Sequence, residues 1–154
     1  MKSQVIRLFE DTNGEGFVDV HADHNGSEKT LNIQTATLLA QHGYQVLLLP
    51  IVDGPGIKNP DAFLIREKRL IEFKHNQTPT ASAIDNEVRD AQKQSDLVLL
   101  HILSEIKPGA LLNGLKDRIR RSEKVKALWL IWKDELIQVT REEVLSGVLD
   151  AKIQ

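Results

Sequence analysis

The segment that most constrains the fold is the run at residues 96–103, which is nearly continuously apolar and has the length of a β-strand. An apolar run of this kind is typical of a strand that is covered on both faces. Helix signals lie on both sides of it. Thr78 and Pro79 supply a cap and a first helical position before the run, and Pro108 begins a second helix after it. The chain is therefore predicted to be an α/β protein with helices against a sheet.

Periodicity and turn residues extend this prediction over the whole chain. The sequence predicts, in order, a hairpin over 5–21 with a turn at Asn13-Gly14, a helix over 28–42 capped by Ser27, a strand over 44–49, a hairpin formed by 62–65 and 70–74, a helix over 79–94, the strand 96–103, a helix over 108–122, a hairpin formed by 126–132 and 136–140, and a helix over 141–149. Residues 28–103 thus form an αβββαβ core with a mixed sheet. An N-terminal hairpin and a C-terminal helix-hairpin-helix extension flank this core in a single domain of residues 1–154.

Composition excludes several classes of protein. The chain has 154 residues and no cysteine, which excludes disulfide scaffolds, thiolate zinc sites and thiol catalysis. The longest apolar runs are far shorter than the ~20 residues that span a bilayer, and no signal peptide opens the chain, so we expect no membrane association and a cytoplasmic site of action. The formal net charge of −2 means that any recognition of phosphate must come from a local patch.

Three charged residues stand where strands otherwise look buried. Glu72 lies between Ile71 and Phe73, and Lys74 follows on the same face of the strand. Burying such groups without partners costs several kcal/mol. If Glu67-Lys68 forms a two-residue turn, Phe63 pairs with Glu72 and Asp61 pairs with Lys74, which brings Asp61, Glu72 and Lys74 together at the open end of the hairpin.

Two carboxylates in one place are suited to Mg²⁺ or Mn²⁺, which prefer oxygen ligands. Such an ion polarises a phosphodiester and lowers the pKa of a bound water. Lys74 beside the ion could orient that water or offset the negative charge that develops during the reaction.

The motif Pro60-Asp61 followed by Glu72-Phe73-Lys74, within an αβββαβ order, resembles the PD-(D/E)XK nuclease superfamily. The chain is also similar to the tRNase-like C-terminal domains of contact-dependent growth inhibition (CdiA) toxins. The residues that carry this second resemblance are His42-Gly43-Tyr44-Gln45-Val46, Leu49-Pro50, Lys58-Asn59-Pro60-Asp61-Ala62 and Glu72-Phe73-Lys74.

The resemblance implies a metal-dependent endonuclease, a hydrolase in which Asp61, Glu72 and Lys74 are catalytic. Asp61 and Glu72 are expected to hold the ion, with the Phe73 carbonyl and Glu28 as further ligands, and Asn32 lies one turn beyond Glu28. The residues expected to contact substrate are Lys58, His75, Arg89, Gln92 and Lys93. The closer resemblance implies tRNA as substrate and an immunity protein as partner, while the wider superfamily leaves DNA open.

Other interpretations of these residues stay open at this stage. Asp61, Glu72 and Lys74 could form a cross-strand salt-bridge cluster, and the scaffold could then serve as a non-catalytic module that binds nucleic acid or protein. His21, Asp23 and His24 could contribute to a zinc site, but a polar loop is favoured because no further ligand is suitably spaced. The basic run over 116–126 is read as a solvated helix face, with contact to a phosphate backbone as the alternative.

Overall fold

The computed structural model describes residues 4–154, and in that range it contains eight β-strands and five α-helices. The hydrogen-bonded strand order follows the chain order from β1 to β8. This mixed α/β architecture agrees with the predicted fold class. The chain divides between Ile71 and Glu72 into two compact units, and each unit is described separately below. The prediction of a single domain stays a prediction.

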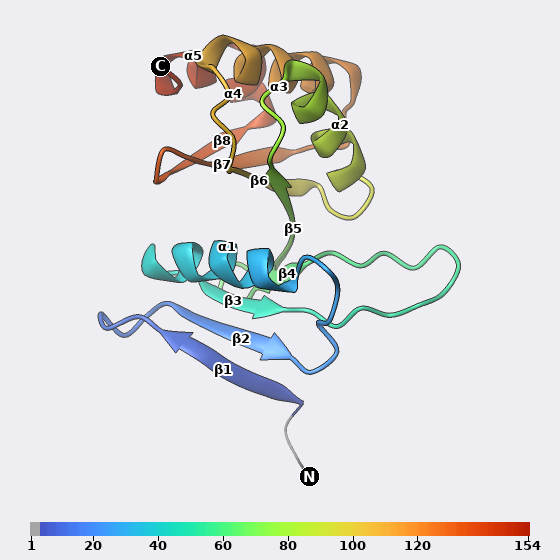
Figure 1. Cartoon of the computed structure of the whole chain (residues 1–154), viewed down its shortest axis with the longest axis vertical. Helices are drawn as coiled ribbons and strands as arrows, with labels where there is room; N and C mark the ends of the chain where they lie inside the picture. The colour runs from blue at the N-terminus through green and yellow to red at the C-terminus, as the bar shows by residue number, and fades with distance from the viewer. Residues whose placement is uncertain (1–3) are drawn as a thin grey trace. The chain divides into compact units, whose positions relative to one another are not determined.

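In the first unit, helix α1 lies along a sheet (Figure 1). Strands β2 and β3 run parallel, whereas β1–β2, β3–β4 and β4–β5 are antiparallel pairs. Its core consists of apolar side chains from these strands and from α1, and nearly all of them are fully buried. The elements are β1 (Val5–Glu10), β2 (Phe17–His21), α1 (Lys29–Gln41), β3 (Gln45–Leu48), β4 (Ala62–Leu64) and the first residues of β5 (Arg69–Asn76).

Two glycines shape the beginning of the first unit. Gly14 has φ +85° in the turn between β1 and β2, a conformation that side-chain-bearing residues rarely adopt. Gly16 lies so close to α1 that a Cβ atom there would be 1.7 Å from the Ala40 carbonyl oxygen. The prediction of Ser27 as the N-cap of α1 is wrong. Glu28 occupies the cap position, and its side chain makes no capping hydrogen bond.

The second unit has parallel β5, β6 and β7, with β8 antiparallel to β7 at the end. Parallel neighbours require crossover connections, and α2 and α3 supply them. One face of the strands packs against the helices in a core that includes Val98, Leu100, Ile84, Val88 and Leu115. The elements after β5 are α2 (Ala81–Ala91), β6 (Leu97–Ile102), α3 (Pro108–Arg121), β7 (Ala127–Trp132), β8 (Glu135–Thr140), α4 (Arg141–Leu145) and α5 (Val148–Lys152).

Helices α2 and α3 pack against each other at a glycine. A Cβ atom on Gly114 would lie 2.5 Å from the Ala81 carbonyl oxygen and 2.7 Å from the Ile84 Cβ atom. The N-cap of α2 is Thr80, whose hydroxyl accepts a hydrogen bond from the Ala83 amide at 3.1 Å. The predicted cap at Thr78 is therefore wrong by two residues, because Thr78 lies in the loop, where its carbonyl accepts hydrogen bonds from the Thr80 amide and the Asn76 side chain.

The element order over 29–102 confirms the predicted α-β-β-β-α-β succession, and the extension after it contains the predicted helix, hairpin and helix. The final helix differs from the prediction, because Gly147, at φ +91°, divides it into α4 and α5. A capping box between Thr140 and Glu143 begins α4.

The register of the hairpin formed by β4 and β5 also differs from the prediction. Phe63 pairs with Leu70, and Leu64 pairs with Arg69, so the turn is the four-residue segment 65–68 rather than Glu67-Lys68 alone. Lys68 adopts a left-handed conformation, φ +56°, within this turn. The predicted pairing of Phe63 with Glu72, and the register that would place Asp61 opposite Lys74, are therefore wrong by two positions.

Candidate active site

In the first unit, Asp61 is held by a chain of hydrogen bonds that begins in a loop. The His24 ring donates from Nδ1 to the Leu49 carbonyl oxygen at 2.6 Å, which leaves Nε2 as an acceptor. Asn32 on α1 donates from Nδ2 to His24 Nε2 at 3.2 Å and to Asp61 Oδ1 at 3.3 Å. His24 and Asn32 are both almost fully buried. The buried amide of Asn32 therefore holds one oxygen of the Asp61 carboxylate.

Among the residues that the structure describes, the side-chain oxygen of Asn32 lacks a hydrogen bond. Within residues 4–154, no hydrogen-bond partner reaches the buried Asn32 Oδ1 atom. A buried carbonyl oxygen without a partner is costly and needs a ligand or a water to satisfy it. Its position beside the Asp61 carboxylate is consistent with a hard cation, because Mg²⁺ and Mn²⁺ prefer oxygen donors.

His21 ends strand β2, and the predicted polar loop follows it from Ala22. His21 accepts a hydrogen bond at Nδ1 from the Asp23 amide at 3.0 Å, a local contact within the turn. His24 is committed to the hydrogen bonds described above. Glu28, predicted as a metal ligand, is an exposed residue at the start of α1, and its carbonyl oxygen accepts from the Asn32 amide at 2.8 Å. It is Asn32, one turn later, whose side chain contacts Asp61.

In the second unit, Glu72 and Lys74 lie on the sheet face that α2 and α3 cover. Glu72 pairs with Val98, and Lys74 pairs with Leu100, and paired residues share a face. Val98 and Leu100 belong to the core under these helices. Glu72 is only 6% exposed, which is unusual for a carboxylate. The sequence therefore places an acid and an amine on the covered face of an interior strand.

Asn76, at the end of β5, links this strand to two other elements. Its fully buried amide donates from Nδ2 to Glu87 Oε1 on α2 and to the Thr78 carbonyl oxygen, each at 2.9 Å. Its Oδ1 atom accepts from the Ser104 hydroxyl at 2.5 Å. Burial raises the pKa of the Glu87 carboxyl, while the Asn76 hydrogen bond and the charge of Lys74 act in the opposite direction. Glu87 is therefore a half-buried carboxyl in the electrostatic field of Lys74.

Sequence reasoning missed Asn76, Glu87 and Ser104. Two signals could have found the first two. Asn76 continues the alternation of Glu72 and Lys74 along the same strand, and Glu87 lies three residues after Ile84, next to the buried stripe of α2. Nothing in the local sequence points to Ser104, since its contact joins residues 28 positions apart.

His75 and His101 lie on the opposite face of the same strands. Strand β5 continues through Asn76, so His75 alternates with Lys74 and pairs with His101 in the register. Their ring centroids are 5.9 Å apart. Burial, helped by the neighbouring His75, lowers the pKa of His101 to about 4, and Asp134 opposes the shift only in part. His101 is therefore uncharged at neutral pH.

The residues predicted to contact substrate have different surroundings. Lys58 is exposed in the loop before Asp61. The next residue, Asn59, accepts a hydrogen bond at Oδ1 from the Val52 amide at 2.8 Å and donates from Nδ2 to the Val52 carbonyl oxygen at 3.1 Å. Gln92 accepts from the Ser122 hydroxyl at 2.6 Å, which ties the end of α2 to the end of α3. Arg89 and Lys93 are exposed beside Asp90.

The predicted metal ligands belong to both units: Asp61 and Glu28 lie in the first unit, and Glu72 and the Phe73 carbonyl lie in the second. Their convergence on one ion stays a prediction. No group of three or more His, Asp or Glu side chains over 4–154 is arranged to hold a metal. The predicted set consists of the Asp61, Glu72 and Glu28 carboxylates with the Phe73 carbonyl. Its oxygen ligands are chemically suited to Mg²⁺ or Mn²⁺.

Comparisons with known proteins give one similarity, which is in the fold. No protein-family model matches the chain, and no curated protein matches it. A chain in a solved structure described as the CdiA-CT/CdiI toxin and immunity complex from Burkholderia pseudomallei is similar with a TM-score of 0.53 and 21% sequence identity. The similarity covers 73% of this chain and 84% of that one. In addition, none of the helices in the described part of the chain is both long and apolar enough to cross a membrane.

Proposed function

We propose that this chain is a metal-dependent nuclease of the PD-(D/E)XK type that hydrolyses phosphodiester bonds, with RNA, and tRNA in particular, as the favoured substrate and DNA as the alternative. The observation that carries the proposal is the pair of Glu72 and Lys74 on the helix-covered face of β5. That strand occupies the expected place in an α-β-β-β-α-β succession. Burying a carboxylate in an interior strand is costly, so a catalytic role explains its presence better than a position without function does.

A bound divalent ion would supply Lewis-acid polarisation of the phosphodiester and a water of lowered pKa. Asp61, Glu72 and the Phe73 carbonyl are the groups proposed to hold it, and Glu28 is a further candidate. The Asn32 amide nitrogen donates a hydrogen bond to one Asp61 oxygen. The buried Oδ1 atom of Asn32 is proposed as a further oxygen ligand of the same ion. Because a buried amide holds one of its oxygens, the carboxylate of Asp61 is expected to need little reorganisation.

Lys74 is proposed to orient the attacking water or to offset the charge that develops on the phosphate. The surroundings of Lys74 support this role. Glu87 provides an adjacent carboxyl with a raised pKa, held by Asn76. The electrostatic interaction of Lys74 with Glu87 fits a group that acts through its charge.

The similarity to a chain of a toxin–immunity complex supports the proposal that this protein acts as a toxin and that an immunity protein inhibits it. The similarity is one of fold, so the substrate and the partner are proposals that depend on biochemical tests. A tightly binding immunity protein is expected to block cleavage.

The experiment compares total tRNA and plasmid DNA as substrates, each with Mg²⁺, with Mn²⁺ and with EDTA. Cleavage of either substrate that needs the ion and is lost in Glu72→Gln supports the proposal. The matched control is Glu135→Gln, an exposed acid in β8. If tRNA and plasmid both stay intact in Mn²⁺, or if Glu72→Gln cleaves as fast as the wild type, the proposal is wrong.

A second arm tests metal binding directly. Titration with Mn²⁺ is expected to show a site that weakens in Asp61→Asn and in Glu72→Gln but not in Asp53→Asn, an exposed loop control. Binding that survives both of the first two substitutions would remove Asp61 and Glu72 as ligands.

A further inference from the structure

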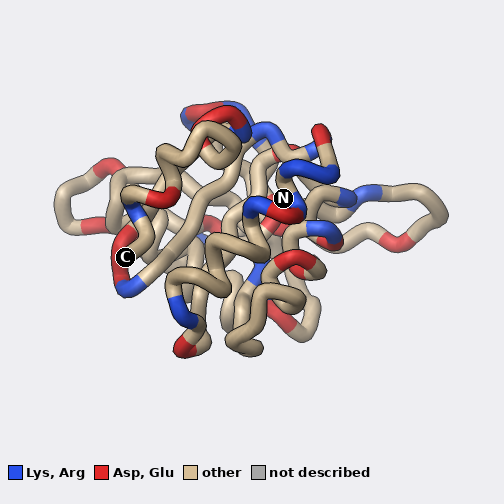
Figure 2. The backbone as a smooth tube through the Cα atoms, turned by 90° about the horizontal axis from the view of Figure 1, so that it is seen from above, with Lys and Arg blue, Asp and Glu red and all other residues tan. Residues whose placement is uncertain are grey.

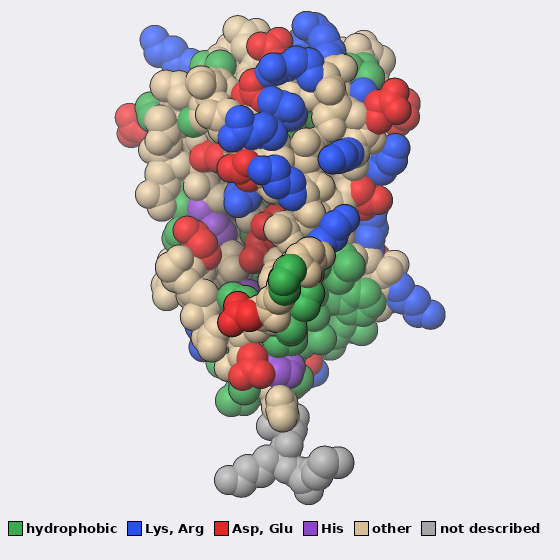
Figure 3. All heavy atoms as spheres, turned by 90° about the vertical axis from the view of Figure 1, so that its right-hand side faces the viewer, with side chains coloured by type: hydrophobic (Ala, Val, Ile, Leu, Met, Phe, Trp, Pro, Cys, Tyr) green, Lys and Arg blue, Asp and Glu red, His purple; other side chains and the backbone are tan. Residues whose placement is uncertain are grey.

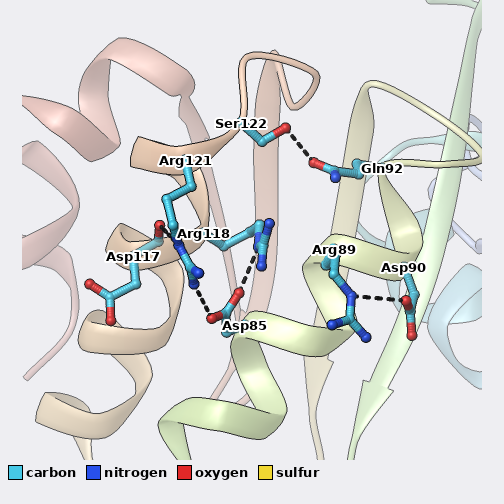
Figure 4. A network of polar contacts seen from close by, with 8 residues as sticks. All are labelled: Asp85, Arg89, Asp90, Gln92, Asp117, Arg118, Arg121 and Ser122. Carbon is cyan, nitrogen blue, oxygen red and sulfur yellow. Dashed lines mark hydrogen bonds and ion pairs between the residues drawn. The ribbon is translucent and has the colours of Figure 1, made fainter.

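Two carboxylates on α2 are each shared by two cations. Asp85 accepts from Arg118 Nε at 2.6 Å and also from Arg121 Nη2, and both arginines lie on α3 (Figure 4). Asp90 lies 3.4 Å from Arg89 Nε and 3.5 Å from Lys93 Nζ. Each carboxylate can neutralise one cation, so each of these groups keeps a surplus positive charge.

Further cations follow at the end of α3. The nearest carboxylate contact of Arg120 is Asp117 Oδ1 at 3.9 Å, at the limit of an ion pair. Lys124 is exposed just after the helix, and its backbone amide donates to the Ser122 hydroxyl at 3.3 Å. The run from α3 to Lys126 thus contains more cations than acids, and its acids are Asp117 and Glu123.

The ends of the two helices lie side by side. The Ser122 hydroxyl donates to Gln92 Oε1 at 2.6 Å, which joins the residue before Lys93 to the residue after Arg121 (Figure 4). Both cationic groups therefore belong to one surface, which we call the α2–α3 cationic face and define by Arg89, Lys93, Arg120, Arg121 and Lys124. Lys and Arg side chains gather over the upper part of the view in Figure 3, which shows the second unit there.

The cations of this face are exposed, while Asp85, the acid that Arg118 and Arg121 share, is recessed. The side chains of Lys93, Arg120 and Arg121 are 62%, 65% and 58% exposed, whereas Asp85 is 20% exposed. Arg118, at 13% exposed, is the structural member that ties α3 to α2. An approaching anion would therefore meet these exposed guanidinium and ammonium groups, with the Asp90 and Asp117 carboxylates, 47% and 61% exposed, among them.

Helix stability accounts for only part of this arrangement. Cations near a helix C-terminus interact favourably with the helix dipole, and both helices end here. That effect does not require several cations to crowd around two shared acids, where they repel one another. Charge interspersed with both signs, as along much of the backbone in Figure 2, is the arrangement that stability alone favours.

We infer that the α2–α3 cationic face binds the phosphodiester backbone of a nucleic acid. The inference deepens the proposed function by assigning a docking surface to the substrate, and it rests on that function for the choice of ligand. The surface recognises phosphate charge and not sequence, because its groups are mobile cations and the face carries no aromatic side chain on which a base could stack. RNA and DNA share this chemistry, and the experiment separates them.

The experiment measures binding in EDTA, where metal-dependent cleavage is absent. A fluorescent RNA hairpin and a DNA duplex of the same length are titrated with the full chain at several salt concentrations. The test variant combines Lys93→Gln, Arg120→Gln and Lys124→Gln, which leaves the Asp85 pairs with Arg118 and Arg121 in place. The control variant combines Lys29→Gln, Lys133→Gln and Lys152→Gln, which are exposed and make the same change in net charge.

The test variant is expected to bind at least about tenfold more weakly at low salt, and its plot of log affinity against log salt should have a slope smaller by about 2 to 3, since each phosphate contact contributes about 0.7–0.9. The control should change neither quantity appreciably. The Tm of the test variant should stay equal to that of the wild type or rise, because a structural role would lower it. Tighter binding of either RNA or DNA identifies the preferred source of the phosphates.

Three outcomes would overturn the inference. The test and control variants could weaken binding equally. The test variant could have a lower Tm while keeping its affinity. Polyglutamate of matched charge density could bind the face more tightly than both nucleic-acid probes. The last result would identify the surface as one for an acidic protein. Absence of cleavage by the wild type in the earlier experiment, with the expected binding here, would defeat the nuclease proposal alone. Normal cleavage with unchanged binding in the test variant would defeat this inference alone.

Discussion

The two units orient their candidate catalytic groups in different ways. In the first unit, Asp61 receives a hydrogen bond from the amide of Asn32, and the same amide also donates to His24. In the second unit, Lys74 lies in the field of Glu87, and Asn76 holds that carboxyl. A neutral amide orients a carboxylate without adding charge, whereas a carboxyl near an amine adds an electrostatic interaction. The first arrangement suits the proposed role of Asp61 as a metal ligand, and the second suits the proposed electrostatic role of Lys74.

Replacing the amine should have the largest effect. Lys74→Ala is expected to lower the cleavage rate by about 10²–10⁴-fold, the usual contribution of a positioned acid, base or charge. Metal binding and Tm should stay near wild type, because Lys74 is proposed to act on the reaction and not on the ion. Single-turnover cleavage rates and a Mn²⁺ titration check this, and unchanged turnover would remove the proposed role.

The close approaches of helices in the two units give the next comparison. Gly16→Ala should destabilise the protein by about 3 kcal/mol or more, because its Cβ atom would meet the α1 backbone at 1.7 Å. Gly114→Ala should cost about 1–3 kcal/mol, since the clash with α2 is milder. Urea unfolding measures both.

Gly109 is the control for these glycine substitutions, because no atom lies within 4 Å of a Cβ atom added there, and alanine suits a helix better than glycine does. Gly109→Ala should leave stability unchanged or raise it slightly. Equal losses at all three positions would contradict the interpretation based on close approach.

The pH dependence of stability should depend on a buried histidine of the second unit. The pKa of His101 is about 4 in the folded protein and near 6.5 when unfolded, so the unfolded state binds more protons between these values. Stability is therefore fully present above about pH 6.5 and falls by up to about 3 kcal/mol as the pH drops towards 4.

His101→Gln should flatten that part of the curve, as urea unfolding at a series of pH values would show. The same substitution at His42, exposed at the end of α1, serves as the control in the first unit. A slope that persists in His101→Gln would assign the pH dependence to other groups.

The smallest expected effect on activity concerns the neutral network of the first unit. Asn32→Ala should lower Mn²⁺ affinity or cleavage by about 10–100-fold, the usual cost of removing a group that orients a metal ligand. Asn32→Asp retains the oxygen and adds charge, so it should keep more metal affinity than Asn32→Ala does. If both variants bind Mn²⁺ as the wild type does, the neutral network orients nothing of functional value.

Much of the fold could be predicted because its signals are local. Apolar periodicity located the helices and strands to within a few residues, and Gly14 and Pro108 marked a turn and a helix start. The errors lie where two local signals competed. Thr78 and Thr80 are both suitable caps, and the chain uses Thr80 because Asn76 engages the Thr78 carbonyl. The last helix divides at Gly147, whose positive φ no apolar pattern reveals.

The sequence by itself determined which chemical groups stand on β5, because alternation along a strand puts Glu72, Lys74 and Asn76 on one face whatever the rest of the chain does. Only the tertiary structure decided what those groups meet. The hairpin register depends on a turn of four residues, and Glu87, Ser104 and Asn32 reach their partners across loops whose path no local pattern specifies. Hydrogen bonds and shared ion pairs act between residues that packing brings together, so their partners follow from the whole fold.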